Sequence, residues 1–292
     1  MRVAAADGTD LCAYDVDGPG EPFCLANGLG GNLDAWRHVV DHFRPQHRII
    51  SWDYRGLYGS GKPVPPQRVA ITDQVDDMLR VMDALGVERP VVFGWSMGVQ
   101  VALELYRRAP DRCRALVLVG GAAGVPLDTA FGALSGRLGI QSLGGFLRPL
   151  LSQLHALEPW FGPVQARLAV LAPFAAWLKH TGLFSPQVDE ALLRELAGGF
   201  LRLDYDVYLA TMKALAEHDA RDMLETIAVP TLVIVGDRDV MTPPAVSESM
   251  ASTIPGAELL TVRGGTHYLP IEYPELLNLR VAKFLRQRVF VG

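Results

Sequence analysis

Short apolar runs alternate along most of the chain with segments whose apolar residues recur at helical spacing. Runs without polar alternation are typical of parallel strands buried on both faces of a sheet. Two segments flanking Asp7-Gly8-Thr9 instead have the outline of a hairpin. Strands are predicted at 2–6, 11–16, 22–26, 47–52, 90–93, 115–119, 231–235 and 258–262. This pattern predicts a doubly wound, mostly parallel, eight-stranded α/β sheet.

Helices are predicted between these strands, and the segment 72–85 is the most clearly amphipathic. Its apolar residues gather on one side, and Asp73, Asp76, Asp77 and Asp83 occupy the other. We expect the acids to form a solvent-exposed face that also favours the N-terminal end of the helix dipole.

Between 125 and 216 the strand pattern stops, and glycine and proline punctuate apolar helical stretches that carry few charges. The strand and helix alternation returns after this segment. We therefore expect one α/β core, built from 1–124 and 217–292, with a helical cap inserted at 125–216.

Composition narrows the class of protein. The 292 residues are 49% hydrophobic and 20% charged, with a formal net charge of -5 and no basic run, which argues against a nucleic-acid partner. The most apolar segment, 166–178, is interrupted by Pro173, so no stable membrane insertion is expected. Three dispersed cysteines indicate neither a disulfide framework nor a metal site, and a cytoplasmic protein is the default expectation.

The strongest chemical signal is Gly94-Trp95-Ser96-Met97-Gly98, which lies between a predicted strand and a predicted helix. A serine on a sharp strand-to-helix turn needs small neighbours, and the helix N-terminus behind it stabilises developing negative charge. Ser96 is therefore the predicted nucleophile, and the N–H of Met97 is one predicted donor to an oxyanion. Trp95 is expected to contact the substrate.

A serine nucleophile needs a base and an acid that orients the base. Of seven histidines, only His267 follows a late core strand, in a glycine-rich loop at the edge where parallel α/β sheets gather their sites. Asp237 and Asp239 both follow the strand at 231–235, and either could supply the acid. The chain order Ser, Asp, His is the order of α/β hydrolases.

These features resemble the α/β-hydrolase superfamily, in its lid-bearing, esterase-like branch, over nearly the whole chain. In that family a G-x-x-D-x-x-x-P pattern follows the acid strand, and Gly236, Asp239 and Pro243 fit it, which selects Asp239. The resemblance also implies that the N–H of Leu29 is the second oxyanion donor.

The chain departs from the family pattern in two loops. Asn27 precedes Gly28-Leu29-Gly30 where the family usually has histidine, a feature that resembles some enol-lactone hydrolases. Tyr58 stands where many relatives carry the second glycine of D-x-R-G-x-G-x-S. The glycine loop does not match a dinucleotide fingerprint, because Leu33 replaces its third glycine.

We therefore expect a serine hydrolase for a small to medium lipophilic carboxylic ester, working without a cofactor or metal as a monomer or homodimer. The same triad could instead cleave C–C bonds, open lactones or enol-lactones, transfer acyl groups or make peracids. Outside enzymes, a ligand receptor of the same fold and an interaction protein docking through the apolar insertion are the alternatives.

Overall fold

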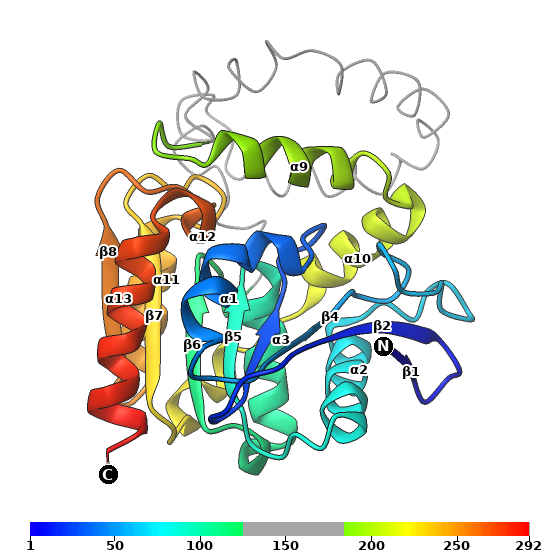
Figure 1. Ribbon diagram of the computed structural model, residues 1–292, viewed down its shortest axis with the longest axis horizontal. Helices are drawn as coiled ribbons and strands as arrows, with labels where there is room; N and C mark the ends of the chain where they lie inside the picture. The colour runs from blue at the N-terminus through cyan, green and yellow to red at the C-terminus, as the bar shows by residue number, and fades with distance from the viewer. Residues whose placement is uncertain (125–183, 292) are drawn as a thin grey trace.

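The computed structural model describes residues 1–124 and 184–291 (Figure 1). Residues 125–183, which make up most of the predicted cap, lie outside the described residues. The strands are β1 (Arg2–Ala4), β2 (Asp10–Val16), β3 (Phe23–Ala26), β4 (Ile49–Trp52), β5 (Val91–Trp95), β6 (Ala115–Val119), β7 (Thr231–Gly236) and β8 (Glu258–Val262). They form one eight-stranded sheet in the order β1-β2-β4-β3-β5-β6-β7-β8. Only the β1–β2 and β2–β4 pairs are antiparallel, so the predicted mostly parallel α/β sheet is confirmed.

The helical elements include the helix predicted at 72–85, which begins and ends one residue earlier than expected. They are η1 (Leu33–Trp36), α1 (Arg37–Phe43), α2 (Ile71–Ala84), α3 (Met97–Arg108), η2 (Pro110–Arg112), α9 (Glu190–Phe200), α10 (Tyr205–Glu217), η4 (Arg221–Thr226), α11 (Pro244–Thr253), α12 (Leu269–Glu272), α13 (Pro274–Phe284) and the π-helical turn η5 (Leu285–Val289). Among the described residues, no helix is both long enough and apolar enough to cross a membrane.

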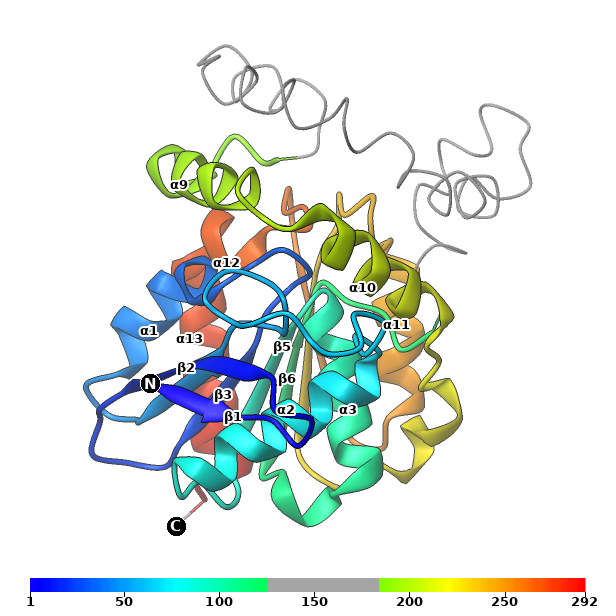
Figure 2. The ribbon, with the colours of Figure 1, turned by 90° about the vertical axis from the view of Figure 1, so that its right-hand side faces the viewer.

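The sheet separates two hydrophobic cores because alternate residues of each strand point to opposite faces. On one face, side chains of α2, α3 and α11 pack against residues such as Val92. On the other face, α1 and α13 pack against neighbours such as Phe93. Figure 2 shows these two helical layers on either side of the sheet. Every residue of β3 to β7 is buried, as expected for strands covered on both faces.

The acidic side of α2 is not entirely exposed, so one expectation was wrong. Asp77 is fully buried and pairs with the guanidinium of Arg55, whose Nε lies 2.7 Å from Asp77 Oδ2. Arg55 also donates to Asp7 at 2.9 Å and to the carbonyl of Arg68 at 2.9 Å. Burial raises the pKa of Asp77 to about 6, and Arg55 opposes that rise. The paired arginine lies 22 residues away in sequence, which is why helical periodicity could not reveal this burial.

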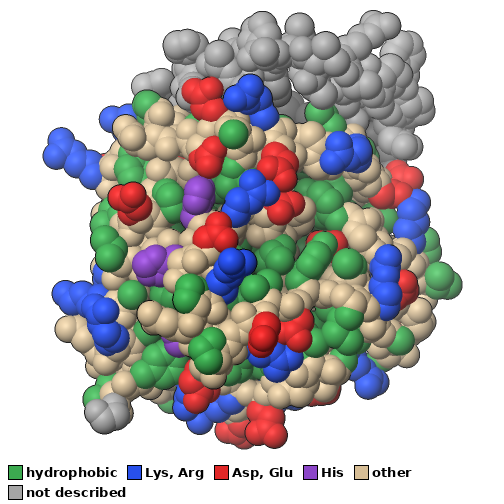
Figure 3. All heavy atoms as spheres, in the orientation of Figure 1, with side chains coloured by type: hydrophobic (Ala, Val, Ile, Leu, Met, Phe, Trp, Pro, Cys, Tyr) green, Lys and Arg blue, Asp and Glu red, His purple; other side chains and the backbone are tan. Residues whose placement is uncertain are grey.

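Helices α9 and α10, the described part of the predicted cap, lie above the carboxyl ends of the parallel strands (Figures 1 and 2). Aspartates cap both helices: Asp189 accepts from the N–H groups of Ala191 and Leu192, and Asp204 accepts from Val207. On the face seen in Figure 3, acidic and basic side chains are interspersed over the described surface. The sheet edge below these helices is where the predicted site residues lie.

Candidate active site

Ser96 occupies the turn that joins β5 to α3. The strand extends to Trp95, two residues beyond its predicted end, so it runs directly into the serine. Ser96 has φ 55° and ψ −117°, a left-handed backbone that non-glycine residues rarely adopt. A Cβ at Gly98 would lie 2.1 Å from the carbonyl oxygen of Ala26, so this flanking glycine is sterically required. The half-buried serine is thereby held at the sheet edge.

Ser96, His267 and Asp239 form one hydrogen-bonded chain. Nε2 of His267 lies 2.8 Å from Ser96 Oγ, and Nδ1 lies 2.9 Å from Oδ2 of Asp239. The three residues follow β5, β8 and β7, which end at the same edge of the sheet. His267 is 4% exposed and Asp239 is 3% exposed, so bulk water is largely excluded from their contact.

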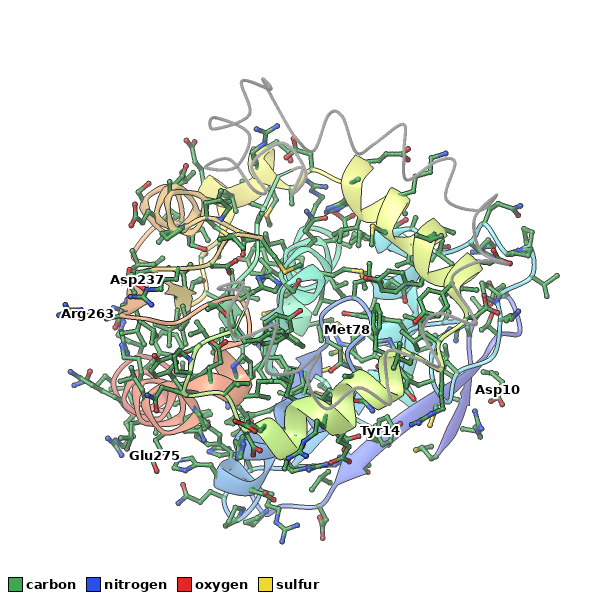
Figure 4. All side chains as sticks on the ribbon, turned by 90° about the horizontal axis from the view of Figure 1, so that it is seen from above. Asp10, Tyr14, Met78, Asp237, Arg263 and Glu275 are labelled. Atoms are coloured by element: carbon green, nitrogen blue, oxygen red, sulfur yellow. The ribbon has the colours of Figure 1, made fainter. Side chains whose placement is uncertain are left out.

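The carboxylate of Asp239 is held by more than the histidine. Oδ1 accepts from the backbone N–H groups of Met241 at 2.9 Å and Thr242 at 2.8 Å. Oδ2 also accepts from the hydroxyl of Thr242 at 2.7 Å. Asp237, the other candidate acid, is exposed and accepts from the N–H of Gly264 at 2.7 Å. Figure 4 shows it at the periphery of the molecule, so only Asp239 contacts the histidine.

The two predicted oxyanion donors flank Ser96. Met97 begins α3, where the first N–H groups have no helical acceptor. Leu29 belongs to the loop after β3, which lies directly against the nucleophile: a Cβ at Gly28 would be 3.2 Å from Cβ of Ser96. In the described part of the chain, neither N–H donates to another protein group. Both are therefore available to an incoming oxygen.

Trp95, the predicted substrate contact, is buried within the core face that carries α1 and α13. Its indole N–H donates to the carbonyl of His267 at 2.8 Å, and its ring meets those of Trp36 and Tyr268 edge-on. The polar end of the indole is thus used to support the histidine loop. Its contact with substrate stays a prediction.

Glu272 is a site-supporting residue that the sequence analysis missed. Its buried carboxylate accepts from both the N–H and the hydroxyl of Thr266, at 2.9 and 2.7 Å, and from the N–H of Ser185 at 2.7 Å. It therefore ties the residue preceding His267 to the chain that enters α9. A single acid at the end of a short helix gives no signal for this role in a lone sequence. Thr242, whose Oγ1 lies 3.2 Å from Nδ1 of His267, was also missed, because nothing in a lone sequence marks this threonine.

Aromatic side chains lie beside the loop that carries Leu29 and beside His267. A Cβ at Gly30 would lie 2.9 Å from the ring of Phe200 and 3.0 Å from that of Tyr208, residues of α9 and α10. Tyr268 follows His267, and its ring lies 4.3 Å, centroid to centroid, from the tilted ring of Phe184. Burial raises the pKa of Tyr268 to about 12, so its hydroxyl remains neutral. These four side chains, the aromatic wall, carry no charge.

Comparisons with known proteins agree with this architecture. A family model described as the alpha/beta hydrolase fold matches residues 21–274. A protein of Azorhizobium caulinodans named as a candidate carbamate hydrolase, RutD, is 28% identical over 268 residues, 91% of each chain. The 3-oxoadipate enol-lactonase 2 of Acinetobacter baylyi is 27% identical over 264 residues, 90% of this chain and 88% of its own length. An esterase structure from Exiguobacterium antarcticum superposes with a TM-score of 0.77 at 21% identity, covering 98% of this chain and 99% of the other, and shows a common fold.

Proposed function

The chain belongs to the alpha/beta hydrolase fold family, and we propose that it is a serine hydrolase that cleaves a small to medium lipophilic carboxylic ester through an acyl-enzyme on Ser96. One observation carries this proposal: Ser96 Oγ, the imidazole of His267 and the carboxylate of Asp239 are linked by hydrogen bonds of 2.8 and 2.9 Å. That arrangement is the one that activates a serine hydroxyl for acyl transfer.

In the acylation half-reaction, Ser96 Oγ attacks the ester carbonyl while Nε2 of His267 takes its proton. Asp239 keeps the proton on Nδ1 and stabilises the imidazolium. The oxyanion lies between the N–H groups of Leu29 and Met97, where loss of a single donor costs on the order of 100-fold in rate. His267 then protonates the leaving alkoxide. Water attacks the acyl-enzyme by the same proton path and regenerates the serine.

The lipophilic substrate class is supported by the aromatic wall. The rings of Phe200 and Tyr208, on the cap helices, contact the loop that carries Leu29, and Phe184 contacts Tyr268, which follows His267. Ligand sites of this kind bind mainly through apolar area and use few polar groups for orientation.

A fluorophosphonate probe tests the proposal directly. We expect covalent labelling of the wild-type protein and hydrolysis of p-nitrophenyl acetate, butyrate and octanoate, with both lost in Ser96→Ala. Ser252→Ala, an exposed serine on α11, is the matched control and should label normally. Labelling that persists in Ser96→Ala would overturn the assignment of the nucleophile. A rate that does not change with acyl chain length would overturn the lipophilic preference.

Lactone or enol-lactone hydrolysis is a second candidate. It is favoured by Asn27 in the oxyanion loop and by the similarity to a protein named as an enol-lactonase. Dihydrocoumarin distinguishes lactone hydrolysis from ester hydrolysis. It is an aromatic lactone, so its ester carbonyl lies within a ring, whereas that of p-nitrophenyl butyrate does not. A kcat/KM for dihydrocoumarin well above that for p-nitrophenyl butyrate would favour the lactone. Adding a p-nitrophenyl carbamate to the panel tests the activity named for the relative from Azorhizobium caulinodans.

A further inference from the structure

The loop that carries Leu29 is a tight turn. The N–H of Gly31 donates to the carbonyl of Gly28 at 2.9 Å, and Gly30 has φ 76°. A positive φ at the second central residue is the mark of a type II turn, with Leu29 at the first central position. The direction of the Leu29 N–H therefore depends on how rigidly the turn is held by its neighbours.

Two tyrosines of one neighbouring loop, residues 53–61, hold this turn at both ends. The hydroxyl of Tyr54 donates to the carbonyl of Asn27 at 2.6 Å. The hydroxyl of Tyr58 donates to the carbonyl of Gly30. The carbonyls at the entry and the exit of the turn are thus both fixed by side chains from outside it.

Tyr58 occupies an unusual backbone position. It has φ 48°, and Ser96 is the only other non-glycine residue with a positive φ in the described part of the chain. This is the position where the family pattern has glycine, which adopts such a conformation without strain. Strained residues persist when their surroundings hold them, and they cluster at functional sites. Here the N–H of Gly59 donates to Asp53 Oδ2 at 3.0 Å, and Ser60 Oγ donates to the carbonyl of Asp53 at 2.7 Å.

The ring of Tyr58 is also supported from the cap side. A Cβ at Gly199, in α9, would lie 3.2 Å from Cε1 of Tyr58. Burial raises the pKa of Tyr58, so its hydroxyl is protonated at neutral pH and can donate. The hydrogen bond to Gly30 therefore comes from a neutral side chain whose ring contacts α9.

We propose that Tyr58 is a positioning residue for the oxyanion hole: by holding the carbonyl of Gly30, it keeps the turn oriented so that the N–H of Leu29 faces the reacting oxygen. The inference rests on the proposed serine-hydrolase function. It explains why a bulky residue stands at a position where the backbone favours glycine.

Tyr58→Phe removes the hydroxyl and keeps the ring. Tyr106→Phe is the matched control, because the hydroxyl of Tyr106 also bonds to the main chain, accepting from Ala228 at 2.9 Å, but on the far part of α3. For p-nitrophenyl butyrate we expect Tyr58→Phe to lower kcat about tenfold with KM unchanged, less than the loss of a whole donor. A trifluoromethyl ketone forms an anionic adduct with the serine, so its inhibition constant should rise by the same factor.

The possible results separate the inference from the function on which it rests. If the wild-type protein neither labels with fluorophosphonate nor turns over esters, lactones or carbamates, both are overturned. If the wild type is active and Tyr58→Phe matches Tyr106→Phe in kcat and in ketone inhibition, the positioning role is refuted alone. A raised KM with unchanged kcat also refutes it, because Tyr58 would then contact substrate. Urea unfolding of both variants confirms that equal amounts of folded protein are compared.

Discussion

Replacing Asp239 with asparagine tests the assignment of the acid, because the surrounding donors dictate how the amide must sit. Two backbone N–H groups point at Oδ1, so the asparagine carbonyl must occupy that position. The amide nitrogen then stands in the place of Oδ2, 2.9 Å from Nδ1 of His267. There it donates to Nδ1 and forces the proton onto Nε2, which faces Ser96 Oγ. The histidine is left in the tautomer that cannot accept the proton of the serine.

We expect kcat of Asp239→Asn to fall about 10⁴-fold, a loss of about 5 kcal/mol of transition-state stabilisation. The cost to folding should be within about 1 kcal/mol, because the amide retains the backbone bonds and the Thr242 hydroxyl can rotate to accept. Stopped-time hydrolysis of p-nitrophenyl butyrate measures kcat, and urea unfolding measures stability.

Asp237→Asn is the matched control, since its carboxylate accepts from Gly264 and makes no contact with the histidine. Its kcat should stay within about twofold of wild type. A kcat for Asp239→Asn within tenfold of wild type, or an equal loss in both variants, would refute the reasoning from tautomers.

Three further predictions follow from the described contacts. Glu272→Gln places an amide donor among three donors, the N–H of Ser185 and the N–H and hydroxyl of Thr266. We expect kcat for p-nitrophenyl butyrate to fall about tenfold with KM unchanged. An unchanged kcat would mean that the histidine loop holds its position without this carboxylate. Asp77→Asn removes one of the two buried carboxylates that Arg55 contacts and leaves Asp7 as the other, so it should lower the free energy of unfolding by about 3 kcal/mol, read from urea titration with unchanged kcat per folded molecule. Burial raises the pKa of Cys113 to about 12 and also raises that of Cys24. Ellman's reagent should therefore modify only Cys12 quickly in the native protein, and all three thiols in denaturant. Fast modification of all three thiols in the native protein would show that the core opens.

The strands and helices could be predicted from the sequence because local periodicity reports burial directly. An apolar run such as 115–119 has no polar face to present to water, and the structure buries it on both sides. The position of Ser96 could be predicted as well, since the required glycines lie two residues before and after it in the chain. The segment 125–183 carries the larger part of the predicted cap, and that prediction lies outside the described residues.

The contacts between distant segments could not be predicted. Asp77 and Asp83 were both expected on the solvent-exposed side of the same helix, yet Asp77 is buried against Arg55 and Asp83 is exposed. Glu272 and Tyr58 likewise act on segments that the sequence does not mark as neighbours.

The sequence by itself determined the sheet, the strand-to-helix serine and a short list of candidate partners, because these depend on residues adjacent in the chain. The resemblance to the family already favoured Asp239 over Asp237. Only the tertiary structure showed that the Asp239 carboxylate lies 2.9 Å from Nδ1 of His267 and which side chains contact the turn that carries Leu29. The physical reason is that a hydrogen bond is decided within a few tenths of an ångström. The distances between donors and acceptors depend on how separate strands end at one edge of the sheet. Periodicity along the chain does not predict them.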